Sequence, residues 1–182
     1  MSCIICLDDD AAYACECSAF HAHCFAKFLA RGHDECSVCH SRFDPRMKAA
    51  ALDLLCTRTS QLLGAAHPSA MARKLETAIA FAEIGRTEVA TRCLRRLISA
   101  STETEWIHSV SQVELARILS REGQIMPAAL VLEELVSKLV TIKQRWSWLE
   151  HLEACALLGA CYSSLGRFAE AENCSSSSLG VI

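Results

Sequence analysis

The sequence predicts a small metal-stabilised finger at the amino terminus, joined by a helix to an all-α domain of repeated helical hairpins. Three observations lead to this fold class. Seven of the twelve cysteines lie between Cys3 and Cys39. Past residue 43 the chain becomes rich in Ala, Leu, Glu and Arg. Triplets of small residues then recur three times with the same internal spacing. We therefore place the finger in residues 1–43, a linking helix and connector in 44–68, and the repeats in 69–182.

Composition and charge exclude several classes of protein. With 182 residues and 52% hydrophobic content, the chain can bury a substantial core. A net charge of -3 argues against binding nucleic acid by neutralising phosphates. The most apolar stretch, 125–142, is interrupted by Glu133, Glu134 and Lys138, so no membrane span is expected. The first residues lack the features of a secretory signal, which predicts a location in the cytoplasm or nucleus.

The clustered cysteines predict metal binding. In a reducing compartment, closely spaced cysteines bind metal more often than they form disulfides. Four ordered ligand pairs provide eight ligands, enough for two closed tetrahedral sites, and thiolate and imidazole groups suit zinc. The expected cofactors are two Zn²⁺ ions. The pairs are Cys3-x-x-Cys6, Cys15-x-Cys17, His21-x-x-Cys24 and Cys36-x-x-Cys39.

The order of these pairs resembles the RING finger family, and in particular its RING-CH variant. The resemblance implies a cross-brace fold, in which the first and third pairs share one ion and the second and fourth pairs share the other. One site would then contain Cys3, Cys6, His21 and Cys24, and the other Cys15, Cys17, Cys36 and Cys39. Plant homeodomain fingers use the same ligand order. They usually place an aromatic residue where this chain has Asp34, so that interpretation ranks second.

The RING resemblance also implies a contact surface for a ubiquitin-conjugating enzyme. Ile5 and Phe28 match the aliphatic and aromatic positions of the groove that binds this enzyme, and both also help to pack a very small domain. Two positions depart from the pattern of active ligases. Ser37 replaces a common proline, and His40 stands where many members have an arginine that contacts both the enzyme and ubiquitin.

The function implied by this resemblance is that of a RING-type ubiquitin ligase. The finger would recruit a conjugating enzyme charged with ubiquitin or a related modifier, and the repeats would bind the substrate. Catalysis would come from orientation, with no covalent nucleophile. The alternative is a non-catalytic adaptor that uses the same zinc fold only for protein contact.

His23 and His33 are expected to lie outside the metal sites, because His21 already supplies the imidazole ligand.

The linking helix has clear boundaries in the sequence. Asp44 can cap it and Pro45 fits its first turn, so the helix should run from there to about Leu63. Gly64 can end the helix in a left-handed conformation, and residues 65–69 are expected to form a connector.

The remaining chain predicts three hairpins of antiparallel helices. In each triplet the small residues allow close helix packing, and the central glycine allows the turn. A bulky residue follows three places after each first member, at Phe81, Leu119 and Tyr162. The triplets are Ala78/Gly85/Ala90, Ala116/Gly123/Ala128 and Gly159/Gly166/Ala171.

These units resemble tetratricopeptide repeats, most closely in Leu158–Tyr162 and Leu165–Ala171. They are separated by 38 and 43 residues instead of the family's roughly 34, which predicts longer helices or loops. The alternative is a generic helical bundle.

The five cysteines in the helical region are expected to act as small buried apolar side chains: Cys56, Cys93, Cys155, Cys161 and Cys174.

The tetratricopeptide resemblance also implies a partner groove. It places Val113, Arg117 and Arg121 on the helix face that lines the concave side of the array. The two arginines are four residues apart and repel each other, so a partner's carboxylate could be held between them. The alternative is a solvated face on which Glu114 pairs with Arg117.

Overall fold

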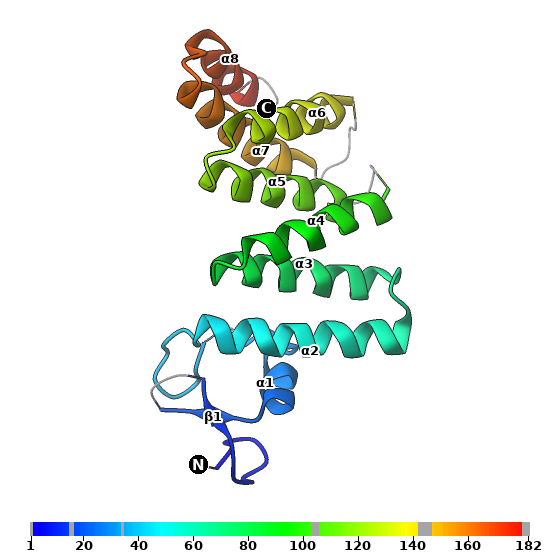
Figure 1. The fold of residues 1–182 in the computed structure, drawn as a ribbon, viewed down its shortest axis with the longest axis vertical. Helices are drawn as coiled ribbons and strands as arrows, with labels where there is room; N and C mark the ends of the chain where they lie inside the picture. The colour runs from blue at the N-terminus through cyan, green and yellow to red at the C-terminus, as the bar shows by residue number, and fades with distance from the viewer. Residues whose placement is uncertain (1, 15–16, 34, 103–105, 142–146, 180–182) are drawn as a thin grey trace. The chain divides into compact units, whose positions relative to one another are not determined.

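The computed structural model describes residues 2–14, 17–33, 35–102, 106–141 and 147–179 (Figure 1). The chain forms two compact units, Met1–Ala90 and Thr91–Ile182. Among the residues that the structure describes, no helix combines the length and the apolar character needed to cross a bilayer.

The finger contains one small hairpin and one short helix. Strand β1 (Ala12–Tyr13) pairs antiparallel with β2 (Ala19–Phe20), so that Ala12 lies opposite Phe20. Helix α1 (Ala22–Leu29) follows directly and buries Cys24, Phe25, Ala26 and Leu29. Two strands and one helix of this size bury too little apolar area to be stable by themselves.

Four aromatic rings form the centre of the finger. Phe20 and Phe25 are 1% and 0% exposed, and their ring centroids lie 5.1 Å apart. Phe43 meets Phe25 edge-on at 4.8 Å and lies 5.8 Å from the rings of both Phe20 and Phe28. Tilted and edge-on ring pairs at these distances add to the stabilisation from burial alone. The aromatic cluster therefore connects the hairpin and α1 to the chain that enters the next helix.

The predicted linking helix is confirmed as α2 (Pro45–Leu63). The Asp44 carboxylate accepts hydrogen bonds from the backbone N–H groups of Arg46 and Met47, both at 3.0 Å. These contacts satisfy two donors that the first helical turn leaves unpaired. Gly64 has the expected positive φ of 89°, but its ψ of 150° is extended, so the helix does not end in the predicted left-handed conformation.

Helix α2 belongs to the same core as the finger. Ala49, Ala51 and Leu52 are buried in one apolar cluster with the finger's aromatic rings. The cluster also contains Ala80 of α3 (Pro68–Glu83). The first compact unit extends to Ala90. A finger with a core this small gains apolar contact by packing against the helix that follows it.

The three predicted hairpin turns share one geometry. The backbone N–H of Arg86, Gln124 and Arg167 donates to the carbonyl of Phe81, Leu119 and Tyr162, in each case over 2.9 Å. The preceding glycines, Gly85, Gly123 and Gly166, have φ values of 79°, 78° and 76°. This is the Schellman pattern, which needs a residue of positive φ after the last helical turn.

The second unit consists of helical hairpins. It contains most of α4 (Thr87–Ala100), followed by α5 (Trp106–Arg121), α6 (Ile125–Thr141), α7 (Ser147–Ser164) and α8 (Phe168–Leu179). Helix α7 packs against α5, α6 and α8 (Figure 1). Ala116 and Ala128 are fully buried and Leu119 is 4% exposed, as expected for residues between closely packed helices.

A polar network connects α6 to the last hairpin. The Tyr162 hydroxyl donates to the Glu133 carboxylate at 2.6 Å, and the Arg167 guanidinium lies 4.4 Å from the centre of the Tyr162 ring. Burial and the contact with Glu133 raise the pKa of Tyr162 to about 12.

The prediction that the helical cysteines act as buried apolar side chains is confirmed for Cys155 and Cys161, which are 2% and 1% exposed. The other three helical cysteines are only half-buried.

Candidate metal centre

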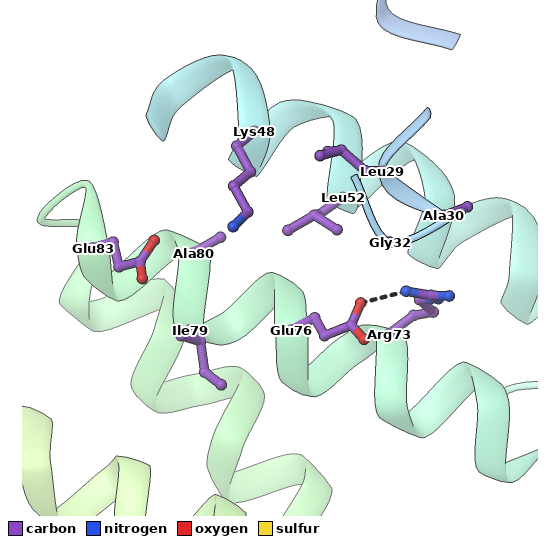
Figure 2. Close-up of a pocket in the computed structure, with 10 residues that line it drawn as sticks. All are labelled: Leu29, Ala30, Gly32, Lys48, Leu52, Arg73, Glu76, Ile79, Ala80 and Glu83. Atoms are coloured by element: carbon purple, nitrogen blue, oxygen red, sulfur yellow. Dashed lines mark hydrogen bonds and ion pairs between the residues drawn. The ribbon is translucent and has the colours of Figure 1, made fainter. Parts of the chain in front are cut away.

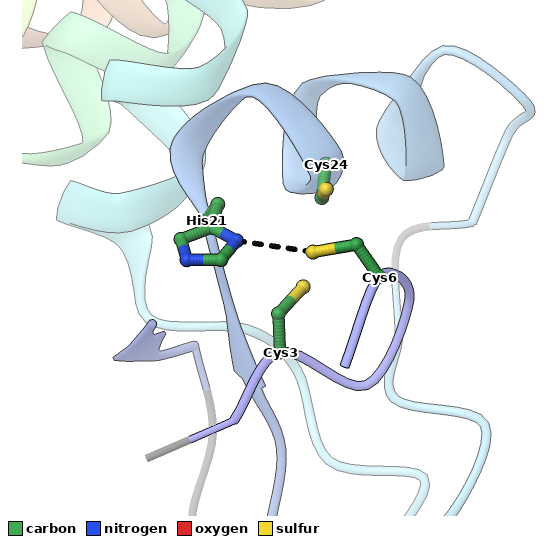
Figure 3. A group of neighbouring side chains, drawn as sticks. All are labelled: Cys3, Cys6, His21 and Cys24. Atoms are coloured by element: carbon green, nitrogen blue, oxygen red, sulfur yellow. Dashed lines mark hydrogen bonds between the residues drawn. The ribbon is translucent and has the colours of Figure 1, made fainter. Parts of the chain in front are cut away.

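The first predicted ligand set comes together in space. The ligand atoms of Cys3, Cys6, His21 and Cys24 all lie within 4.8 Å of one another (Figure 3). Cys3 and Cys6 come from the first loop, His21 lies between β2 and α1, and Cys24 lies in the first turn of α1. The first ligand pair precedes the hairpin and the third pair follows it. The two pairs thus lie close together in space, as the RING resemblance implies.

The two Cys-x-x-Cys loops have the same backbone form. In each, the residue after the second cysteine has a positive φ, 64° at Leu7 and 55° at His40. Each of these residues donates its N–H to the carbonyl of the first cysteine, at 2.8 Å for Leu7 and 2.9 Å for His40. A non-glycine residue adopts this conformation at some cost. The cost is consistent with a loop that must turn two sulfur atoms toward the same point.

A backbone contact orients His21. Its Nε2 lies 2.6 Å from the carbonyl oxygen of Asp9, and its Nδ1 lies 3.2 Å from the Cys6 sulfur. Because a carbonyl oxygen can only accept, Nε2 carries the proton, and the lone pair of Nδ1 faces the thiols. The Asp9 carbonyl also raises the pKa of His21. This arrangement presents Nδ1 as the ligand atom and fixes the ring through the other nitrogen, as in many zinc sites.

The thiols of this cluster differ in acidity. Burial disfavours the Cys3 thiolate, yet backbone hydrogen bonds from Cys6, His21 and Ile5 lower the pKa of Cys3 to about 6. Burial and the neighbouring thiols of Cys6 and Cys3 raise the pKa of Cys24 to about 11. Several thiolates close together repel one another, and a cation placed among them relieves that repulsion. The donors are soft sulfur atoms and an imidazole nitrogen, which fit Zn²⁺.

The second cluster contains Cys17, Cys36 and Cys39, whose sulfur atoms also lie within 4.8 Å of one another. Its fourth predicted ligand, Cys15, is outside the described residues. Two hydroxyl groups support the cluster, and sequence reasoning missed both. Ser18 Oγ lies 3.1 Å from the Cys36 sulfur, and Ser41 Oγ lies 2.8 Å from the Cys39 sulfur.

These hydroxyl contacts favour the ionised thiols. Burial raises the pKa of Cys36, but the Ser18 hydroxyl and the backbone N–H groups of Cys39 and Val38 lower it to about 5. Hydrogen bonds from Ser41 likewise lower the pKa of Cys39. Thiolates are the form that binds metal, so the surroundings of this cluster prepare it for a cation.

The two remaining histidines of the finger have other contacts. His23 stacks on His21 with ring centroids 5.5 Å apart, and its Nε2 lies 3.2 Å from the Cys24 sulfur. His33 stacks on Phe28 at 4.5 Å. Among the described residues, neither histidine belongs to a group of potential metal ligands.

The predicted contact residues of the finger differ in exposure. Ile5 is 46% exposed and His40 lies at the surface. Phe28 is partly buried by the aromatic cluster and by His33, so much of its ring serves packing. The structure adds three exposed apolar side chains that sequence reasoning missed: Ile4, Leu7 and Val38, at 42%, 77% and 69% exposure. Their positions beside the predicted ligand cysteines could have indicated them.

The predicted partner groove on α5 is not as expected. Val113 is only 2% exposed, so it belongs to the core and does not line a groove. Arg117 forms ion pairs with Glu114, one turn away, and with Glu153 of α7. The proposed repulsion between Arg117 and Arg121 is thus already relieved within the chain. The alternative with Glu114 describes this face better, and Arg121 remains exposed.

The first unit also has a surface cavity of about 330 Å³ between α1, α2 and α3 (Figure 2). Leu52 and Ala80 contribute apolar surface, and Lys48 and Glu83 lie at one end. The nearby Arg73 and Glu76 bind each other at 2.6 Å. Both signs of charge are present, so the cavity has no clear preference for a charged ligand.

Comparison with known proteins identifies the fold of the helical part. No family model matches the chain, and no curated protein is similar to it. A solved structure of a putative kinesin light chain from Podosopora anserina, with nearly identical TPR-like repeats, matches with a TM-score of 0.62 and 21% identity. The match covers 87% of this chain and 72% of that one. A singly substituted variant of the same protein gives a TM-score of 0.64, with the same identity and coverage.

This likeness confirms the tetratricopeptide-like fold. At 21% identity it concerns the fold alone. The prediction of helical hairpins is thereby confirmed over the alternative of a generic bundle. The assignment of the finger to the RING type remains a prediction based on its ligand order and on the cysteine clusters.

Proposed function

We propose that this protein is an adaptor, in which a finger with two zinc ions and a tetratricopeptide-like array each bind another protein. The metal would have a structural role. The first cluster supplies four ligand atoms within 4.8 Å of one another, enough for a complete tetrahedral shell. A filled shell has no position for water or a substrate, so the site suits holding the loops in place.

The observation that carries this proposal is the surface of the finger. Ile4, Ile5 and Leu7 are 42%, 46% and 77% exposed in the first cysteine loop, and Val38 is 69% exposed in the second. Exposed apolar side chains on so small a domain favour contact with another protein. The zinc ions would hold both loops rigid, which reduces the entropy lost on binding.

A second candidate function is that of a RING-type ubiquitin ligase. Ile5 favours it, because this residue matches the family's contact position and is exposed. Three features weigh against it: the partial burial of Phe28, Ser37 in place of proline, and His40 in place of arginine. In a ligase, Ile5 would hold the conjugating enzyme and His40 would help to orient the attached ubiquitin, without forming a covalent bond.

Lysine discharge from conjugating enzymes charged with ubiquitin separates the two functions. We expect the zinc-loaded wild-type protein to leave the discharge rate unchanged across a broad panel of enzymes. His40→Arg is expected to leave it unchanged as well. Acceleration by the wild type would overturn the adaptor proposal in favour of the ligase, provided that Ile5→Ala abolishes it. Leu54→Ala is the matched control, because Leu54 is a similarly exposed aliphatic residue, at 43%, on α2.

A further inference from the structure

Helix α4 carries a cluster of three arginines on its exposed side. Leu94 and Leu97 face the core of the protein and are 0% and 2% exposed. Arg92, Arg95 and Arg96 are all exposed. Residues three and four positions apart are neighbours on a helix, with Cβ atoms roughly 5–6 Å apart. The three guanidinium groups therefore share one side of α4, which we call the arginine face.

The arginine face has no ion-pair partner in the part of the chain that the structure describes. Other arginines of the second unit behave differently, since Arg117 and Arg167 each pair with two carboxylates. Three arginines against the single acidic residue Glu88 also leave α4 with a net positive charge. Like charges at these spacings repel one another, and a bound anion would relieve the repulsion.

The helix dipole does not account for this cluster. The dipole favours cations in the last turn of a helix, and its effect fades beyond that turn. Helix α4 runs to Ala100, and its last turn contains no basic residue. The three arginines thus contribute little to the stability of the helix that carries them.

The exposure of the arginine face does not depend on where the sequence ends. Helix α4 is an internal element, with α3 before it and α5 after it in the chain (Figure 1). The helices of the second unit pack through apolar side chains such as Ala116, Ala128 and Leu119. A further helix of the same kind would have to bury three unpaired charges, which is costly.

We propose that the arginine face binds an acidic segment of a partner protein, with carboxylates spaced one helical turn apart. This proposal rests on the proposed adaptor function and names one of its binding surfaces. A guanidinium group pairs with a carboxylate through two parallel hydrogen bonds, which gives affinity and fixes the orientation. Arg92 and Arg96 are separated by roughly 6 Å along the helix axis, so the face fits two or three carboxylates.

A nucleic acid fits this face less well. Binding through phosphates commonly involves about 6–10 contacts, more than three guanidinium groups supply. The net charge of -3 on the whole chain also disfavours a long polyanion. A short acidic segment matches the number of charges that the face presents.

The binding test uses a fluorescent peptide of about 20 residues, in which glutamates recur at positions i, i+3 and i+4 among alanines. The peptide is added to the zinc-loaded full-length protein at low salt, and fluorescence anisotropy measures binding. Binding should be saturable and should weaken as the salt concentration rises, because salt screens exposed charges. The same peptide with glutamine in place of every glutamate should not bind.

Two double variants test the arginine face itself. Arg95→Gln together with Arg96→Gln should weaken binding by about fivefold or more, because two of the three charges are lost. Arg92→Gln together with Arg96→Gln should have the same effect. The matched control is Arg58→Gln together with Arg121→Gln, which removes two exposed arginines from elsewhere and should leave the affinity unchanged. Circular dichroism checks that all variants are equally helical.

Four results would overturn the proposal. The first is the absence of binding to the wild-type protein, or equal binding of the glutamine peptide. The second is an equal loss of affinity in the control variant, since overall charge would then explain the binding. The third is tighter binding of a DNA duplex of about 20 base pairs that Arg95→Gln with Arg96→Gln abolishes, because a nucleic acid would then be the partner. The fourth is self-association of the wild-type chain that the same variant abolishes, because acidic residues 8–10 of a second copy would then be the occupant.

The adaptor function is tested separately by ubiquitin discharge. Discharge by the wild-type protein would overturn the adaptor function while the glutamate peptide still bound to the arginine face. Loss of peptide binding without any discharge would instead overturn only this surface. The two failures can therefore be distinguished.

Discussion

Replacing Phe43 by alanine should strongly destabilise both the finger and α2. Phe43 is 4% exposed, and its ring meets those of Phe25, Phe20 and Phe28 at 4.8 to 5.8 Å. Removing a buried phenylalanine side chain costs about 3–5 kcal/mol. Three edge-on ring contacts put this residue in the upper part of that range. A unit of 90 residues has a total stability of roughly 5–13 kcal/mol, so the loss is a large fraction of it.

Hydrogen exchange of the zinc-loaded protein measures this effect. The backbone amides around Ala49 to Leu52 of α2 should lose protection by about a thousandfold, which corresponds to about 4 kcal/mol. Amides of α5 to α7 should be unaffected, and they serve as an internal reference. Phe168→Ala is the matched control, because Phe168 is 70% exposed and its loss should change stability by less than about 0.5 kcal/mol. If Phe43→Ala leaves protection in α2 within about tenfold of wild type, α2 does not depend on the finger.

Three further predictions concern the metal, the helix cap and the pH response. Elemental analysis should find two zinc ions per chain, and Cys24→Ser should lower this number while α5 to α8 stay helical; a wild-type ratio near one would contradict the two-site assignment. Asp44→Ala should reduce the stability of α2 by about 1 kcal/mol in denaturant unfolding, because two hydrogen bonds to the first turn are lost. Asp53→Ala, an exposed substitution within the same helix, should have almost no effect. Because folding raises the pKa of Tyr162 from 10.0 to about 12, its contribution is fully present below about pH 10 and is lost as the pH rises toward 12. The loss should be on the order of 2–3 kcal/mol. Tyr162→Phe should remove this pH dependence of unfolding, and a variant that keeps it would exclude Tyr162 as the cause.

Local features of the chain could be predicted from the sequence. Asp44 and Pro45 define the start of α2 because capping depends on a few neighbouring residues. The glycine turns of the hairpins were predictable for the same reason, since Gly85 and its equivalents satisfy a local need for positive φ. The resemblance to RING fingers implied that Cys3, Cys6, His21 and Cys24 would meet, and their ligand atoms lie close together.

Features that depend on packing between distant segments could not be predicted. Val113 was placed in a groove, but α7 packs against α5 and Val113 is buried. No pattern near Arg117 indicates that Glu153, 36 residues away, would pair with it. The Ser18 and Ser41 hydroxyls were missed because serine is common in loops, and only the fold brings them to sulfur atoms.

The shared core of finger and helices limits how this architecture can evolve by recombination. A finger that folded alone could be moved between proteins as a single exon or cassette. Here the apolar side of the finger is completed by Leu52 of α2 and Ala80 of α3, so a transplant cut at residue 43 would expose the aromatic cluster to water. A transferable segment would have to include both helices. Sequence changes in the finger are therefore expected to be accompanied by compensating changes in α2 and α3.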